Sequence, residues 1–167
     1  MEVLVVFPMV ALAYPTSWYL SVPIILQGNQ PICWACSSAS AIQYISGNGS
    51  GIPSLADLEA ETGYYGGAPW SAVDYVLAYW GIYYNETYSK PSFNTVATSI
   101  SSGDPVIVSC DNATEGHVVE LRGYAAGSNP SVSYMDPNYG AYQAQAYSTF
   151  TVQNDKTIQI ADYNLHE

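Results

Sequence analysis

Residues 27–36 read Gln-Gly-Asn-Gln-Pro-Ile-Cys-Trp-Ala-Cys, and this stretch decides how the chain is organised. Pro31 closes a loop rich in glycine and asparagine, at a place where proline favours the start of a helix. The run that follows is apolar or small, carries no charge, and is stopped by Gly47 and Gly49. We therefore predict a helix over residues 33–46 that is buried on most of its sides.

Cys33 is predicted to lie at the N-terminus of this helix. The free backbone N–H groups and the positive end of the helix dipole at that place favour a thiolate over a thiol. Cys33 is therefore the candidate nucleophile. Cys36 lies one turn inside the helix, away from the end of the dipole, and we interpret it and Cys110 as small buried apolar residues. Three cysteines do not suggest a disulfide framework.

Two later motifs supply groups for acid–base chemistry. Residues 116–124 read Gly-His-Val-Val-Glu-Leu-Arg-Gly-Tyr, which places His117 at the head of a predicted strand. Residues 134–138 read Tyr-Met-Asp-Pro-Asn, which places Asp136 at the end of the next one. The chain has two histidines, and the other, His166, lies in the C-terminal tail. A base for the thiol must therefore be His117.

Cysteine, histidine and aspartate follow one another in this chain order, with a glutamine six residues before the cysteine and a tryptophan directly after it. This combination resembles the papain-like cysteine peptidases. The Cys-Trp-Ala-Cys run differs from the Cys-Gly-Ser-Cys-Trp of plant and lysosomal members. Together with the short chain and the Gly-His, Gly-Tyr and Asp-Pro pairs, it is more similar to bacterial members, of the bacteriocin-leader-peptidase-like and secreted effector types. The resemblance covers about residues 27–160.

The resemblance implies a role for each site residue. Cys33 would attack a peptide carbonyl, and His117 would act as general base and acid. Asp136 would orient the imidazole, with Asn138 as the alternative orienter. Gln27 and the backbone N–H of Cys33 would hold the oxyanion. Two other functions remain open: a different amide acyl transfer on the same scaffold (isopeptide, cell-wall amide or transpeptidation), and a catalytically silent binding module.

The expected partners are a peptide or protein substrate, and a prosegment or protein inhibitor is a further possible partner. The formal charge of −11 argues against nucleic acid, and no run approaches the ~18 apolar residues that insertion into a membrane needs. The scarcity of Lys and Arg, three in all, suits a secreted or extracellular protein.

No cofactor is expected. A zinc site could be built from Cys33, Cys36, Cys110 and His117. We do not favour a zinc site, because the Cys33-x-x-Cys36 pair alone has metal-ligand spacing. The same pair lacks the βαβ context of a thioredoxin-like redox motif.

The hydrophobic pattern predicts an α+β fold of the papain-like kind, with an N-terminal helical half (27–103) packed on a C-terminal antiparallel sheet (104–164) and a cleft between them. Residues 27–167 form the predicted peptidase domain, and residues 1–26 form an extended strand or the remnant of a prosegment. Besides the first helix we predict helices over residues 54–62, 69–80 and 92–102. Strands are predicted over residues 3–7, 82–84, 105–110, 117–124, 131–135, 148–152 and 156–161.

Overall fold

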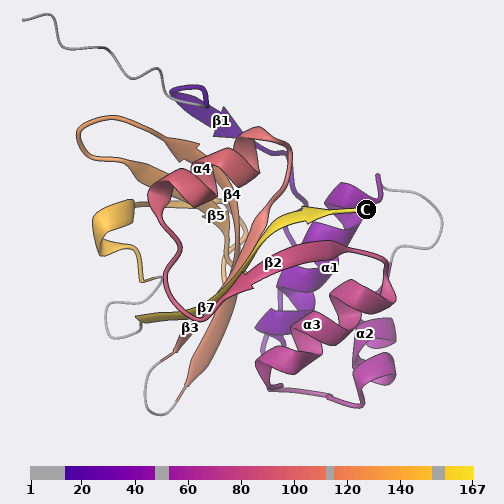
Figure 1. Ribbon diagram of the computed structural model, residues 1–167. Helices are drawn as coiled ribbons and strands as arrows, with labels where there is room; N and C mark the ends of the chain where they lie inside the picture. Colours follow the sequence, from indigo (N-terminus) through magenta and orange to yellow (C-terminus); the bar gives the residue numbers. More distant parts are fainter. Residues whose placement is uncertain (1–13, 48–52, 112–114, 152–156) are drawn as a thin grey trace, which may run out of the picture.

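The computed structural model describes residues 14–47, 53–111, 115–151 and 157–167, and its fold is α+β, as predicted (Figure 1). The helices are α1 (Cys33–Ile45), α2 (Leu55–Thr62), α3 (Trp70–Tyr79) and α4 (Phe93–Ser101). The strands are β1 (Ser17–Tyr19), β2 (Tyr83–Thr87), β3 (Val106–Asp111), β4 (Gly116–Ala125), β5 (Ser131–Met135), β6 (Gln143–Ala146) and β7 (Thr157–His166). Within the described parts of the chain, no helix has the length and hydropathy that crossing a bilayer requires.

The strands form an antiparallel sheet in the order β2-β7-β3-β4-β5-β6, and β1 pairs with β4. β3 pairs with the first part of β4, and β1 pairs with its last three residues, so β1 extends the sheet beyond the end of β3. Gly123 in β4 allows this approach, because a Cβ atom there would lie 2.2 Å from the ring of Tyr19. The last strand, β7, lies between β2 and β3, so β2, which precedes α4 in the chain, belongs to the same sheet as the C-terminal strands.

Helices cover both faces of the sheet, and the alternation of side chains along the strands separates two cores. On one face, α1, α2 and α3 pack against Ile107, Val118 and Leu165. On the other face, α4 packs against a set that includes Val108 and Val119. Every residue of α1 from Trp34 to Ile42 is buried, as the apolar sequence of this helix predicts.

The predicted helix starts are confirmed at two positions. Ser54 and Asp57 form a capping box at the start of α2: the Asp57 N–H donates to Ser54 Oγ at 3.2 Å, and the Ser54 N–H donates to Asp57 Oδ2 at 2.8 Å. Ser92 caps α4 by accepting from the Thr95 N–H at 3.0 Å. These contacts satisfy N–H groups that have no partner within the helix.

The strand predicted over residues 148–152 is wrong. Tyr147–Thr149 form a 3-10 helix, while the strand lies earlier, at β6. Tyr147 and Phe150 are the apolar residues buried here, and their spacing of three suits one turn of a 3-10 helix better than a strand. β6 reads Gln-Ala-Gln-Ala, which has no β-branched or aromatic residue to indicate a strand. The strand predicted over residues 3–7 lies outside the described residues.

Glu120 of β4 is completely buried between the sheet and α1. The Ser40 hydroxyl contacts the Glu120 carboxyl and lies 2.8 Å from the Pro23 carbonyl oxygen. A hydroxyl has one hydrogen, so both contacts are hydrogen bonds when a protonated Glu120 donates to Ser40 and Ser40 donates to Pro23. Burial raises the pKa of Glu120 to about 8, and the charge of Arg122 acts in the opposite direction. The neutral carboxyl therefore connects β4, α1 and the segment that leads to the site.

This pKa makes stability depend on pH. The folded protein keeps a proton on Glu120 that the unfolded chain releases above its usual pKa of 4.5. The stability that this proton contributes is therefore lost as pH rises from 4.5 through about 8. We expect the unfolding free energy of the Glu120→Gln variant to fall less than that of the wild type over this range, by on the order of a few kcal/mol. Urea denaturation at several pH values measures it. Glu167→Gln, at an exposed position, is the control, and equal pH slopes for wild type and Glu120→Gln would contradict the prediction.

Candidate active site

Cys33 is the first residue of α1, and its side chain is partly exposed. Ile32 occupies the N-cap position. Its side chain makes no capping hydrogen bond to the N–H groups of the first turn. The preceding loop turns at Gly28, whose φ of +60° is one that glycine adopts without strain. A hydrogen bond of 3.2 Å from the Gln30 N–H to the Gln27 carbonyl closes this turn. The local sequence thus presents the sulfur at the start of the helix.

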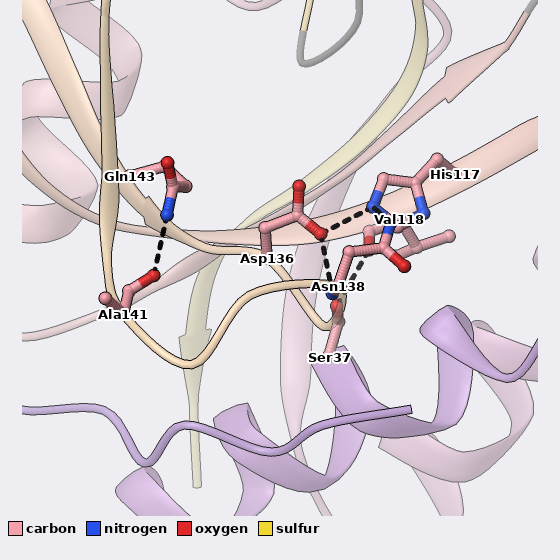
Figure 2. Close-up of polar contacts among 7 residues, drawn as sticks. All are labelled: Ser37, His117, Val118, Asp136, Asn138, Ala141 and Gln143. Carbon is pink, nitrogen blue, oxygen red and sulfur yellow. Dashed lines mark hydrogen bonds and ion pairs between the residues drawn. The ribbon is translucent and has the colours of Figure 1, made fainter. Parts of the chain in front are cut away.

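His117 lies at the start of β4 and is hydrogen bonded to Asp136, which directly follows β5 (Figure 2). The distance from His117 Nε2 to Asp136 Oδ1 is 2.8 Å, and both side chains are buried. The second ring nitrogen, Nδ1, is turned away from Asp136 (Figure 2). Cys33 and His117 line the same cavity, and Cys33 is among the groups that raise the pKa of the His117 ring. Since Nε2 is engaged by Asp136, Nδ1 is the ring atom available to the sulfur.

The pKa of His117 is raised from 6.5 to about 9. Burial of the ring acts against its charged form, but the hydrogen bond to Asp136 and the negative charges of Cys33 and Asp136 outweigh burial. The imidazolium form is therefore favoured at neutral pH. This is the charge state in which a histidine stabilises a thiolate next to it.

Asn138, the alternative orienter, lies beside the same ring nitrogen. Its Nδ2 atom is 3.3 Å from His117 Nε2, and its backbone N–H donates to Asp136 Oδ1 at 2.9 Å (Figure 2). A ring nitrogen that donates its hydrogen to Asp136 cannot accept one from Asn138, so the side-chain contact does not add a second hydrogen bond. The backbone contact instead holds the Asp136 carboxylate in place.

Gln27 is hydrogen bonded to the loop that contains Asp136 and Asn138. Its backbone N–H donates to the Pro137 carbonyl at 3.0 Å, which connects the loop before Cys33 to the loop after β5. Its amide oxygen is buried and has no hydrogen-bond partner among the described residues. The Gln27 side chain lines the same cavity as Cys33 and His117.

A buried hydrogen bond holds α1 against β4 beside the sulfur and the imidazole. Ser37 lies one helical turn after Cys33, and its hydroxyl donates to the Val118 carbonyl at 3.1 Å (Figure 2). Val118 directly follows His117 in β4. The bond therefore restrains the distance between the two elements that carry the candidate nucleophile and base. Sequence analysis missed this residue, although its spacing of four from Cys33 puts it on the same helix face.

The side chains meet in a cavity of about 660 Å³ between the helices α1 and α3 and the β3–β4 hairpin. The residues that line it include Gln27, Cys33, Trp34, Trp70, His117 and Asn138. At Gly116 the carboxylate of Asp111 lies 2.9 Å from where a Cβ atom would be, so a larger residue would displace it. Asp136 is not among the lining residues, so it contacts His117 on the side of the ring that faces away from the cavity.

The residues considered for zinc do not converge. Cys36 is buried among α1, α2 and α3, while Cys110 is buried in the core on the opposite face of the sheet. Burial raises the pKa of Cys36 to about 12, and the negative charges of Cys33 and Glu59 add to this effect. The predicted site residues Gln27, Cys33 and His117 share the cavity, and Asp136 contacts His117. Cys36 has no place in this arrangement.

Comparison with known proteins points in the same direction. A family model described as the papain-like cysteine protease AvrRpt2 matches residues 16–155. The matched segment contains all four candidate site residues. No curated protein matches the chain.

Proposed function

The chain belongs to the family of the papain-like cysteine protease AvrRpt2, and we propose that Cys33 is the nucleophile with which it cleaves its protein substrate. It is thus a cysteine-type peptidase of the effector type. The observation that carries the proposal is the buried hydrogen bond from His117 to Asp136, together with the shared cavity that Cys33 and His117 line. This geometry supports a thiolate–imidazolium pair whose ring is oriented by a buried carboxylate.

The reaction proceeds in two steps. In the first, the Cys33 thiolate attacks the carbonyl carbon of a peptide bond, and His117 gives its proton to the leaving amine as the C–N bond breaks. The product is a thioester between Cys33 and the acyl part of the substrate. In the second, His117 takes a proton from water, the resulting hydroxide equivalent attacks the thioester, and the carboxylic acid leaves as the C–S bond breaks. Asp136 keeps Nδ1 of His117 directed at the sulfur in both steps.

Gln27 is proposed as the side-chain donor of the oxyanion hole. Its amide lines the cavity beside Cys33, and the backbone N–H of Cys33 belongs to the first turn of α1, where N–H groups lack helical acceptors. Two such donors would hold the negative oxygen of the tetrahedral intermediate. The backbone bond from Gln27 to Pro137 supports its position.

The Gln27→Ala variant tests this role. We expect kcat to fall by about 10²–10³-fold with a much smaller change in KM, because the donor acts on an oxygen that is charged only in the transition state. Gln30→Ala is a matched control, since Gln30 is exposed in the same loop and does not line the cavity. A rise in KM with unchanged kcat would assign Gln27 to substrate binding instead.

Cleavage of a peptide library by wild type and by the Cys33→Ala variant tests the proposed function as a whole. Hydrolysed peptides that appear with the wild type alone support it. Products joined to an added amine would indicate transpeptidation, and branched or cell-wall substrates would identify isopeptide or wall-amide cleavage. A protein that cleaves nothing and does not react with a thiol-directed peptide inhibitor would be a binding module with this fold.

Residues 14–26 are proposed to be part of the mature peptidase domain rather than a removable prosegment. Several contacts support this: β1 pairs with β4, the Leu20 N–H donates to the Arg122 carbonyl at 2.7 Å, and the Tyr142 hydroxyl donates to the Val22 carbonyl at 2.6 Å. Removing this segment would leave the last three residues of β4 without their β1 partner. Secretion is likewise a proposal, supported by the small number of Lys and Arg residues at which trypsin-like proteases could cleave.

A further inference from the structure

Three carboxylates from separate elements meet between α3 and the β2 side of the sheet, away from the catalytic residues. Asp74 lies on α3, Glu86 on β2 and Asp162 on β7, and Glu86 and Asp162 are direct partners in the β2–β7 ladder. One carboxylate oxygen from each residue lies within 4.8 Å of the other two. This juxtaposition of negative groups requires an explanation, because like charges directly opposite one another destabilise a sheet.

Asp162 is the strongest indication that a ligand belongs here. It is completely buried, and neither of its carboxylate oxygens has a hydrogen-bond partner among the described residues. One oxygen of Asp74 is also buried without a partner there. A buried carboxylate without a partner costs several kcal/mol, so such groups are normally paired or bound to a metal. The unsatisfied oxygens of Asp162 and Asp74 belong to the same cluster.

Basic residues do not neutralise the cluster in the part of the chain that the structure describes. The sequence has three Lys and Arg residues in total. Lys90 donates to the carbonyls of Tyr147 and Phe150, and Arg122 donates to the Leu20 carbonyl, so both are engaged elsewhere. The Trp70 indole, which is a neutral donor, donates to Glu86 at 3.1 Å. The negative charge is thus left to a proton or to a bound cation.

We propose that Asp74, Glu86 and Asp162 form a binding site for a divalent cation, with Ca²⁺ as the ion that fits best. The ligand atoms are all oxygens, which select Ca²⁺ and Mg²⁺ over zinc and copper. Ca²⁺ binds oxygens at about 2.3–2.6 Å, so two of its ligands can lie up to about 5 Å apart. Mg²⁺ at about 2.0–2.1 Å draws its ligands closer, to about 4 Å at most. Separations within 4.8 Å fit the ligands of Ca²⁺, and a set of three protein carboxylates favours Ca²⁺ because Mg²⁺ usually keeps several waters and binds one or two carboxylates.

The place of this site gives the ion a structural effect on the cleft. Trp70, which donates to Glu86, also lines the active-site cavity. An ion that joins α3 to β2 and β7 would hold this wall of the cavity against the sheet. Without the ion, the burial of Asp162 and the charges of Asp74 and Glu86 raise the pKa of Asp162 to about 8, which agrees with three carboxyls that repel one another.

Thermal unfolding of EDTA-treated, dialysed protein tests the proposal. CaCl2 should raise the Tm of the wild type by about 5–10 °C at a concentration roughly 100 times Kd, and MgCl2 should raise it less. Asp162→Asn should abolish the response to CaCl2, because it removes the buried ligand that is charged when the ion is bound. Glu167→Gln is the matched control: it removes one exposed negative charge directly after β7 and should respond as the wild type does. Calorimetric titration of the wild type with CaCl2 should give one site.

Two results would overturn the proposal. One is a wild-type Tm that does not change with CaCl2 up to ~10 mM, about ten times the Kd of the weakest protein calcium sites, which would mean that the carboxyls share protons instead. The other is an Asp162→Asn variant that responds as strongly as the wild type. Where Asp162→Asn does not fold, Glu86→Gln replaces it, with the same loss of response expected. These readouts are independent of peptidase activity, so the outcome does not depend on the catalytic assignment.

Discussion

Replacing Cys33 by alanine is expected to abolish peptide hydrolysis, with kcat/KM lowered by at least about 10⁴-fold. The acyl-enzyme cannot form without the sulfur, and among the described residues that line the cavity Cys33 is the single cysteine. The fold should tolerate the change, because Cys33 is partly exposed and α1 is held by the buried residues that follow it. The measurement is the initial rate of hydrolysis of a peptide substrate, with circular dichroism to confirm folding.

Cys36→Ala is the matched control for this experiment. Cys36 lies three residues further along the same helix but is fully buried, and burial raises the pKa of its thiol to about 12. Its loss should change kcat/KM by less than about threefold, since a buried neutral thiol does not react. A thiol-directed peptide inhibitor should label the wild type once, at Cys33. Labelling at Cys36, or hydrolysis retained by Cys33→Ala, would disprove the assignment of the nucleophile.

The helical framework could be predicted, and candidate site residues could be chosen, because local signals mark both. The start of α1 follows from a proline and a glycine-containing loop, and its burial follows from thirteen residues without a charge. Caps such as Ser54 with Asp57 are contacts within one turn, so the sequence contains both partners. His117 could be identified because the chain offers a single alternative histidine.

Contacts between distant segments left no such signal. Strand β6 consists of alanine and glutamine and is held in the sheet by pairing with β5, which local preference does not indicate. The bond from Gln27 to Pro137 joins backbone atoms, which every sequence offers. The carboxylates of Asp74, Glu86 and Asp162 lie on three elements, and only the order of β2 and β7 in the sheet brings them together.

The second large effect is expected from Asp136→Ala, which should lower kcat/KM by about 10²–10⁴-fold. The variant removes the acceptor that holds His117 Nε2, so the ring can rotate and present the wrong nitrogen to Cys33. Asp136→Asn keeps an oxygen that can accept this hydrogen bond but loses the charge, so its loss should be smaller. Asn138→Ala should cost less than about tenfold, because Asn138 makes no second hydrogen bond to the ring. A larger loss for Asn138→Ala than for Asp136→Ala would make Asn138 the orienter.

The pH profile distinguishes an orienter of His117 from a residue that only stabilises the loop. The hydrogen bond and charge of Asp136 help to raise the pKa of His117 to about 9, so its removal must lower that pKa. The alkaline limb of kcat/KM, which reports loss of the imidazolium in the coupled Cys33–His117 pair, should lie near pH 9 in the wild type and move to lower pH in both Asp136 variants. Folding stability also decreases toward alkaline pH, because the contribution of a protonated His117 is complete below pH 6.5 and is lost as pH rises through about 9. An alkaline limb that stays in place after Asp136→Asn would show that the carboxylate does not act through the imidazole.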